Sequence, residues 1–148
     1  MSADAPDTAE VRNVFEQHIP SIASGIVTIR GIARDRGNRS VLAVSSSDPA
    51  TDPVGSCVGL RGATIKSIVK ELRGEFVDIV RWSDSAKEFL GNLFTPMRFY
   101  NISFDETSRQ VIAVLKADSQ LDPSKTVALK SRLFTQLTGY TLQFDMEH

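Results

Sequence analysis

The stretch DPVGSCVGLRGATIKSIVKEL, from Asp52 to Leu72, decides the fold that the sequence predicts. Three glycines precede its amphipathic run, at Gly55, Gly59 and Gly62. Asp-Pro is typical of a helix start, because the aspartate oxygen can cap the helix and proline lacks an N–H that has no partner there. We therefore expect a short helix that stops at Gly59, a tight turn, and a second helix that starts at position 62 or 63.

The second helix is amphipathic. Its apolar residues recur at helical spacing on one face, at Ile65, Ile68, Val69 and Leu72. Three basic residues, Lys66, Lys70 and Arg73, lie off that stripe, and Gly74 is placed to end the helix. A strand is expected to follow over Phe76–Trp82, because this segment is rich in β-branched and aromatic residues.

The turn Gly59-Leu60-Arg61-Gly62 is a G-x-x-G motif between two helices. Unpaired N–H groups and the helix dipole at the start of the second helix favour an anion there. Glycines at both ends of the turn allow close approach of a phosphate chain, and Arg61 adds a cation. An apolar groove floor is expected from Val58, Ile65 and Ile79. The spacing alone also fits a tight turn without a ligand, so the surrounding elements have to decide.

The elements before the motif complete a small domain. We expect residues 1–8 to form a disordered tail and residues 9–23 to form a helix that breaks at Pro20. Two strands, residues 26–33 and 40–46, flank the hairpin turn RDRGNR. The order is helix, strand, strand, helix, helix, strand, and the domain is predicted to span residues 9–82.

The second half repeats this order. The sequence predicts a helix from Ser83 to Phe94, strands over residues 97–104 and 109–116, a second Asp-Pro helix start at Asp122, and a strand over residues 140–144. The segment ELRGEFVDI at residues 71–79 aligns with QLTGYTLQF at residues 136–144, an offset of 65 residues. We predict an α+β fold of two tandem modules, the second spanning residues 83–148, each a small sheet packed on helices.

Composition and charge limit the function. Hydrophobic residues make up 41% and charged residues 24%, and the formal net charge of -1 excludes a globally basic nucleic-acid binder. Residues 26–82 nevertheless carry nine Lys and Arg against six Asp and Glu. No apolar run is long enough to span a membrane and the N-terminus does not resemble a secretory signal, so a cytoplasmic location without membrane association is expected.

The chain offers little for catalysis or metal binding. Its only histidines are His18 and His148, and the single cysteine, Cys57, is expected to be a buried apolar residue. We therefore expect no catalytic residues, no metal site and no cofactor. Trp82 is interpreted as a packing residue more readily than as a platform for a base. The hairpin arginines Arg34, Arg36 and Arg39 fit phosphate contacts and a solvated turn equally well.

A G-x-x-G turn in this element order is what a KH module of the type II, helix-first topology requires. DPVGSCVGLRG followed by IVKELRGEFVDIVRWS resembles the first of two KH domains in the bacterial NusA transcription factor family. GIVTIRGIARDRGNRSVLAV, KEFLGNLFTP and QLTGYTLQF resemble the neighbouring strands, the joining helix and the end of the second domain. The resemblance implies single-stranded RNA binding in transcription elongation, termination or antitermination, with RNA polymerase or other transcription factors as further partners.

Two departures from the family matter. No glycine occurs between Gly91 and Gly139, and Thr126 and Val127 would block close backbone approach, so we expect the second module to lack the loop contact. Lys125, Lys130 and Arg132 are interpreted as solvated charges more readily than as RNA ligands. Family members also carry a polymerase-binding domain and an oligonucleotide-binding barrel before the KH pair. This sequence has neither and is expected to be a fragment or a stand-alone paralogue, which leaves polymerase attachment open.

The sequence thus predicts an RNA-binding site in the first module. The loop residues carried over from the resemblance are Gly59, Leu60, Arg61 and Gly62, and the added candidates are Val58, Ile65, Lys66, Lys70 and Arg73. The alternative is a protein-interaction module that docks onto RNA polymerase or another factor without binding RNA. An excess of exposed apolar surface on the second module would favour that alternative.

Overall fold

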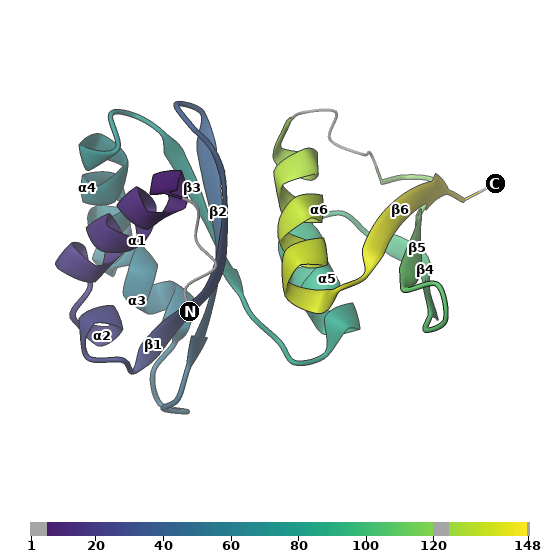
Figure 1. Ribbon diagram of the computed structural model, residues 1–148, viewed down its shortest axis with the longest axis horizontal. Coiled ribbons are helices and arrows are strands. Elements are labelled where there is room, and N and C mark those ends of the chain that lie inside the picture. The colour runs from purple at the N-terminus through teal and green to yellow at the C-terminus, as the bar shows by residue number, and fades with distance from the viewer. Residues whose placement is uncertain (1–5, 120–124, 148) are drawn as a thin grey trace. The chain divides into compact units, whose positions relative to one another are not determined.

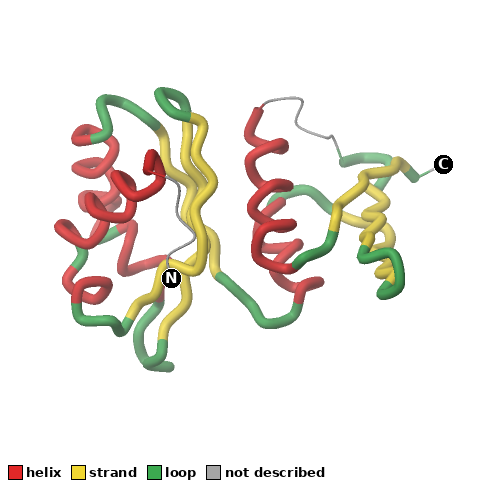
Figure 2. The backbone as a smooth tube through the Cα atoms, in the orientation of Figure 1, coloured by secondary structure: helices red, strands yellow, loops and turns green. Residues whose placement is uncertain are grey.

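The computed structural model describes residues 6–119 and 125–147, with the side chains of Pro6 and Lys125 excepted (Figure 1). The chain divides into two compact units, Met1–Trp82 and Ser83–His148. In each unit a three-stranded sheet carries its helices on one face (Figure 2). The predicted α+β class is confirmed. None of the helices in the described part of the chain has the length and hydropathy that crossing a bilayer requires.

The first unit contains the predicted order of elements. These are α1 (Pro6–His18), α2 (Pro20–Ala23), β1 (Val27–Asp35), β2 (Arg39–Ser46), α3 (Pro53–Val58), the 3₁₀ turn η1 (Leu60–Gly62), α4 (Ala63–Glu71) and β3 (Phe76–Arg81). The sheet order is β1-β2-β3, with β1 and β2 antiparallel and β2 and β3 parallel. The 3₁₀ turn in the loop is the one element that the sequence pattern did not indicate.

The first helix begins earlier than expected. α1 starts at Pro6, so residues 6–8 of the expected disordered tail are helical, and residues 1–5 lie outside the described residues. Tertiary contacts explain the earlier start, because Thr8 is buried and the Asp7 carbonyl accepts a hydrogen bond from Arg34 Nη1 at 2.5 Å. The predicted break at Pro20 is confirmed, since Ile19 is extended and caps the start of α2.

A single apolar core joins the helices to the sheet in the first unit. Its members come from α1, α2, β1, β2, α3 and the end of α4, and they are Val11, Val14, Phe15, Ile19, Ile22, Val27, Ile29, Ile32, Leu42, Val44, Cys57, Ile68 and Leu72. The half-buried Ile65 and Ile79 pack against this cluster. Burial of these side chains is the main stabilising contribution to the fold.

A buried ion pair closes the end of the first unit that lies at the C-terminus of α4. Arg34 Nε and Nη2 donate to the Glu75 carboxylate at 2.9–3.1 Å, and both side chains are almost fully buried. The Gly37 amide and the Ser40 hydroxyl also donate to this carboxylate, at 3.0 and 2.7 Å. Glu10 Oε1 lies 2.7 Å from Arg34 Nη1. Arg34 is therefore a structural residue, and the reading of it as a hairpin phosphate contact is wrong.

The second unit repeats the sheet of the first. Its elements are α5 (Ala86–Phe94), β4 (Phe99–Asp105), β5 (Gln110–Leu115), α6 (Lys125–Thr138) and β6 (Thr141–Met146). The sheet order is β4-β5-β6, again an antiparallel pair followed by a parallel pair. A register shift interrupts β4 near its start, as another does in β1. β3 and β6 start 65 residues apart, at Phe76 and Thr141, which is the offset of the predicted repeat.

Two details of the second unit differ from the prediction. Ser85, not Ser83, caps α5: its hydroxyl oxygen accepts from the Glu88 amide at 3.3 Å, while Ser83 Oγ accepts from the Ser85 amide. Ser85 and Glu88 have the spacing of a capping box, a signal that was present in the sequence. Among residues 116–119 and 125–139 the structure has one helix, α6, where two were expected. The Asp122-Pro123 helix start lies outside the described residues.

A cluster around Tyr140 joins the β4–β5 turn to the end of α6. The Tyr140 hydroxyl donates to Glu106 Oε1 at 2.5 Å, and the Arg109 guanidinium lies 4.2 Å from the centroid of the Tyr140 ring. Arg109 Nη2 also donates to the Thr138 carbonyl at 3.1 Å. Tyr140 follows Gly139 at a helix–strand junction, as Glu75 follows Gly74, so the two clusters occupy equivalent corners of the two units.

Candidate nucleic-acid interface

The G-x-x-G turn lies between α3 and α4, as predicted. Asp52 caps α3 by accepting from the Val54 amide at 3.1 Å, and Pro53 occupies the first turn. α3 ends where the Gly59 amide donates to the Gly55 carbonyl at 2.9 Å. Gly59 has φ +78° and ψ 172°, a conformation that is almost exclusive to glycine.

Gly59 serves the packing of the two helices. A β-carbon at this position would lie 2.2 Å from Thr64 Oγ1 and 2.9 Å from the Thr64 backbone nitrogen. The side of Gly59 that a side chain would occupy is therefore filled by the first turn of α4. The expectation that both glycines leave room for a phosphate chain needs correction for Gly59, because a side chain here would meet Thr64 of this chain.

Gly62 is different. It has the left-handed values φ +74° and ψ 14°, and its amide donates to the Gly59 carbonyl at 3.1 Å. A β-carbon here would come no nearer than 3.9 Å to Ile65 Cγ2 and 4.0 Å to Lys66 Cε. The backbone at Gly62 is thus open on the side that a side chain would occupy, and the left-handed conformation favours glycine.

The two residues between the glycines project into solvent. Leu60 is 86% exposed, the highest value among the exposed large hydrophobic side chains of the described residues. Arg61 is also exposed and has φ +56° and ψ 27°, a left-handed conformation that is uncommon outside glycine. The loop therefore presents an apolar and a cationic side chain at an open corner of the backbone.

The start of α4 is electropositive. Gly62 at the N-cap provides no side-chain oxygen, and the first turn of α4 contains no acidic residue. Lys66 and Lys70 are exposed and four residues apart, so they lie on one face of the helix. Helix amides, the dipole of a nine-residue helix and these ammonium groups combine to favour an anion beside the loop.

Arg73 is not part of this arrangement. It follows the C-terminal end of α4, the end opposite the loop, and it has φ +59°. Its Nη2 lies 3.4 Å from Glu10 Oε2, an ion pair that links it to α1. Of the three basic residues predicted along this helix, the structure therefore brings Lys66 to the loop, continues the face with Lys70, and separates Arg73 from both.

The apolar candidates lie under and beside the loop. Val58, Ile65 and Ile79 are all half-buried, and Ile65 and Ile79 contact the core cluster. Cys57 is fully buried next to them, as expected, and burial together with the negative charge of Asp52 raises the pKa of its thiol to about 12. Cys57 is thus inert packing material.

Trp82 and the hairpin arginines have partners within the first unit. The Arg30 guanidinium lies 5.7 Å from the centroid of the Trp82 ring, and Arg30 Nε donates to Ser45 Oγ at 2.9 Å. Arg39 pairs with Asp78 at 2.7 Å and lies over the ring of Phe76. These contacts support the interpretation of Trp82 as a packing residue.

The second unit lacks an equivalent glycine turn in the residues that the structure describes. Thr126 and Val127 are half-buried in the first turn of α6, Lys130 is half-buried one turn later, and Arg132 is exposed. The side chain of Lys125 lies outside the described part of the chain. The glycine-to-threonine and glycine-to-valine differences are consistent with the loss of the loop contact that the sequence predicts.

Two residues important to the site were not found from the sequence. Thr64 fixes the requirement for glycine at position 59, and Glu75 withdraws Arg34 from the surface. Both relationships join residues whose proximity depends on the tertiary fold. The acidic residue directly after Gly74, in a segment of otherwise apolar character, was the one available signal for the buried pair.

Comparison with known proteins agrees with this geometry. The profile of the NusA-like first KH domain family matches residues 6–82. The "Transcription termination/antitermination protein NusA" of Thermus thermophilus is 36% identical over 135 residues, 91% of this chain and 35% of that protein. The protein of the same name from Bacillus subtilis is 36% identical over 140 residues, 93% of this chain and 37% of that protein.

A solved structure shares the fold. The crystal structure of APE1850 has a TM-score of 0.65 at 20% sequence identity, and the match covers 94% of this chain and 96% of that one. The chain spans about a third of the length of the curated relatives it matches. The family profile covers more than half of the chain and includes the whole of the glycine loop and both helices around it. The chain therefore belongs to the NusA-like KH family.

Proposed function

We propose that the first unit binds single-stranded RNA, with the backbone of the RNA against the loop of residues 59–62 and its bases over Val58, Ile65 and Ile79. The role in the cell is that of a NusA-like factor in transcription elongation, termination or antitermination. Relatives named as transcription termination/antitermination proteins support this assignment. In this proposal the chain is a binding protein and not an enzyme.

One observation carries the proposal: the corner at Leu60, Arg61 and Gly62 is open. Leu60 is 86% exposed, and a β-carbon at Gly62 would meet no atom within 3.9 Å. A loop whose only function was to connect two helices would gain from burying a leucine, because exposure of such a side chain forgoes about 1.5–3 kcal/mol. An exposed leucine beside a cation and uncapped helix amides suits contact with the ribose and phosphate of a strand.

The cationic contribution is small. Arg61, Lys66 and Lys70 are the side chains available to phosphates at this corner, while Arg73 pairs with Glu10 and Arg34 with Glu75. RNA binding should therefore be of modest affinity and should weaken with salt, with a slope set by about three phosphate contacts. Binding without strong sequence discrimination follows if most of the energy comes from the backbone.

Docking onto RNA polymerase or another factor without RNA is the alternative function. It would be favoured by an excess of exposed apolar side chains on the second unit. Among the described residues the exposed large hydrophobic side chains are Ile26, Leu60 and Phe76 in the first unit and Tyr100 and Met146 in the second. This distribution gives the second unit no excess and leaves RNA binding as the better-supported function.

The test is a titration of the chain with short single-stranded RNA at low and moderate salt. The wild type should bind more tightly at low salt, and the double variant Leu60→Asp with Arg61→Asp should show no detectable binding. Both side chains are exposed, and aspartate tolerates the left-handed conformation at position 61, so the melting temperature should change little. Unaltered RNA binding by the double variant would refute the assignment of the site.

Arg36→Asp is the matched control. Arg36 is exposed in the β1–β2 turn, at the end of the unit where Gly37 contacts Glu75, remote from the loop. Its replacement changes the charge by the same amount as Arg61→Asp. RNA affinity in this variant should stay within about twofold of the wild type, because exposed charges separated by more than a Debye length are largely screened. An equal loss in both variants would reduce the loop contact to a general charge effect.

A further inference from the structure

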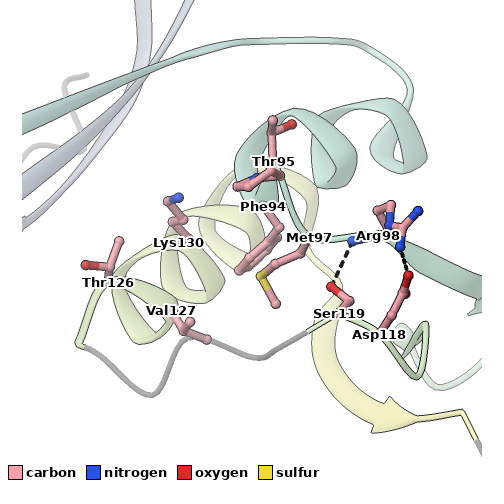
Figure 3. A pocket seen from close by; sticks show the side chains of 10 residues that line it. Phe94, Thr95, Met97, Arg98, Asp118, Ser119, Thr126, Val127 and Lys130 are labelled. Carbon is pink, nitrogen blue, oxygen red and sulfur yellow. Dashed lines mark hydrogen bonds and ion pairs between the residues drawn. The ribbon is translucent and has the colours of Figure 1, made fainter.

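A pocket of about 360 Å³ lies within the second unit, which we call the α5–α6 pocket (Figure 3). It is formed by the end of α5, the segment that leads into β4, the turn after β5 and the first turns of α6. Its lining residues in the described part of the chain are Phe94, Thr95, Pro96, Met97, Arg98, Asp118, Ser119, Thr126, Val127 and Lys130. This volume is within the range of small-ligand sites in proteins.

The internal repeat shows that the wall of this pocket has changed character. At the offset of 65 residues, Lys130 of α6 is equivalent to Ile65 of α4. Ile65 packs against the core of the first unit, whereas Lys130 is half-buried in the wall of a cavity. Placing a lysine at a core-facing position costs rotamer entropy and part of its hydration, so a gain is expected from a ligand.

One side of the pocket is apolar. Phe94 is almost fully buried, and Met97 and Val127 are half-buried (Figure 3). The flexible thioether of Met97 and the edge of the Phe94 ring form a surface that adapts to a flat apolar group. Such a surface alone would suit many ligands, so the polar groups have to define the class.

The polar groups favour an anion. Arg98 is paired with Asp118, so these two side chains contribute no net charge. Lys130 has no ion-pair partner among the described residues and gives the lining a net positive charge, and the first turn of α6 carries no acidic residue. Ser119 is 9% exposed; its Oγ accepts from the Arg98 amide at 3.1 Å, which leaves its proton free to donate to a ligand.

We propose that the α5–α6 pocket binds a nucleoside monophosphate, with the phosphate between Lys130, Ser119 and the start of α6, and the base against Phe94, Met97 and Val127. The ligand can be a free nucleotide or the phosphorylated end of an RNA strand, since both present the same group. The site is independent of the loop of residues 59–62, and its chemistry differs from that loop in requiring a terminal phosphate monoester.

The experiment is an NMR titration of the full chain, with the backbone amides of Thr126, Val127 and Lys130 as reporters. The probes are AMP, UMP, inorganic phosphate, and a short RNA with and without a 5′-phosphate. Saturable shifts of these amides with either mononucleotide identify a free-nucleotide site. Shifts only with the 5′-phosphorylated RNA identify a strand-end site. No shift with any phosphorylated nucleoside, or inorganic phosphate binding as tightly as AMP and UMP, overturns the proposal.

Lys130→Gln tests the role of the cation, and Lys87→Gln is its matched control on the exposed start of α5. Lys130→Gln should weaken nucleotide binding at least about tenfold, the size of one lost charge-assisted hydrogen bond. Lys87→Gln should leave it unchanged. Equal affinity of the wild type and Lys130→Gln, with both folded by circular dichroism, would overturn the proposal. The Leu60→Asp, Arg61→Asp variant should retain nucleotide binding, which separates this proposal from the RNA-binding assignment.

Discussion

Gly59 and Thr64 are in contact across the loop between α3 and α4, so closely that a β-carbon on Gly59 would lie 2.2 Å from Thr64 Oγ1. Real β-carbons do not approach other atoms at such distances. The first glycine of the motif therefore holds two helices together, while the second, Gly62, leaves the backbone open. The two glycines are equal in the sequence motif and differ in physical role.

Gly59→Ala should destabilise the fold more than Gly62→Ala. At position 59 the alanine meets both the side chain and the backbone of Thr64 and adopts a conformation typical of glycine, so a loss of roughly 3 kcal/mol is expected. At position 62 only the left-handed conformation is unfavourable, and about 1 kcal/mol is expected. Urea denaturation measures both. Equal losses would show that strain at the positive φ, and not the Thr64 contact, accounts for the requirement at Gly59.

Glu75→Gln should cost about 3 kcal/mol in the free energy of unfolding, because it removes the carboxylate that compensates the buried Arg34. Asp78→Asn is the matched control, since Asp78 pairs with Arg39 at 2.7 Å in a partly exposed position. The control should lose less than about 1 kcal/mol. Chemical denaturation of both variants checks this, and a loss at Glu75 no larger than at Asp78 would contradict the structural role of the buried pair.

Acid should destabilise the first unit through the same carboxylate. Burial raises the pKa of Glu75, but the hydrogen bonds from Arg34, Gly37 and Ser40 outweigh it and hold the pKa below the ordinary value of 4.5. A lowered folded pKa means that the unfolded state takes up the proton first. The stabilisation is therefore present above about pH 4.5 and is lost as the pH falls through the lowered pKa. Stability measured from about pH 7 to about pH 3 should fall less steeply in Glu75→Gln than in the wild type.

Cys57 should be unreactive in the folded protein. Burial and Asp52 raise the pKa of its thiol to about 12, so the thiolate is scarce at neutral pH and is also inaccessible. A thiol reagent at mildly alkaline pH should modify the native chain at the rate of unfolding and the urea-denatured chain at once. Rapid modification of the native chain would indicate that the core around α3 opens locally.

The salt dependence of RNA binding should identify the phosphate contacts. With Arg61, Lys66 and Lys70 engaged, the slope of log K against log salt is expected to be about −2. Lys66→Gln should reduce its magnitude by about 0.7. Arg73→Gln should leave the slope unchanged, because Arg73 is at the other end of α4 and pairs with Glu10. A smaller slope in the Arg73 variant would place RNA along the whole helix.

The sequence predicted the elements of the first unit well, because its punctuation is local. Asp52, Pro53 and Gly59 define α3 by cap, ring and backbone freedom, and each acts on its immediate neighbours. The open corner at Gly62 followed from the same local reasoning.

What the sequence did not predict depends on distant partners. Arg34 looked available in a polar turn, but Glu75, 41 residues later, buries it. The role of Thr64 required the angle between two helices to be known. The separation of Arg73 from the loop required the end of α4 to be compared with α1. The α5–α6 pocket is lined by four separate segments and leaves no local signature.

The equivalent corners at Glu75 and Tyr140 have a consequence for how the two halves can evolve. Both follow a glycine with positive φ at the junction of the last helix and last strand, and both tie that junction to the preceding hairpin. One does so with a shielded carboxylate and guanidinium, the other with a phenol, a glutamate and a stacked arginine. A chimera that exchanged only these two residues would leave each half with half of a fastener. Each half therefore inherits its corner as a matched set, and descent from a common ancestor required several coordinated substitutions at that place.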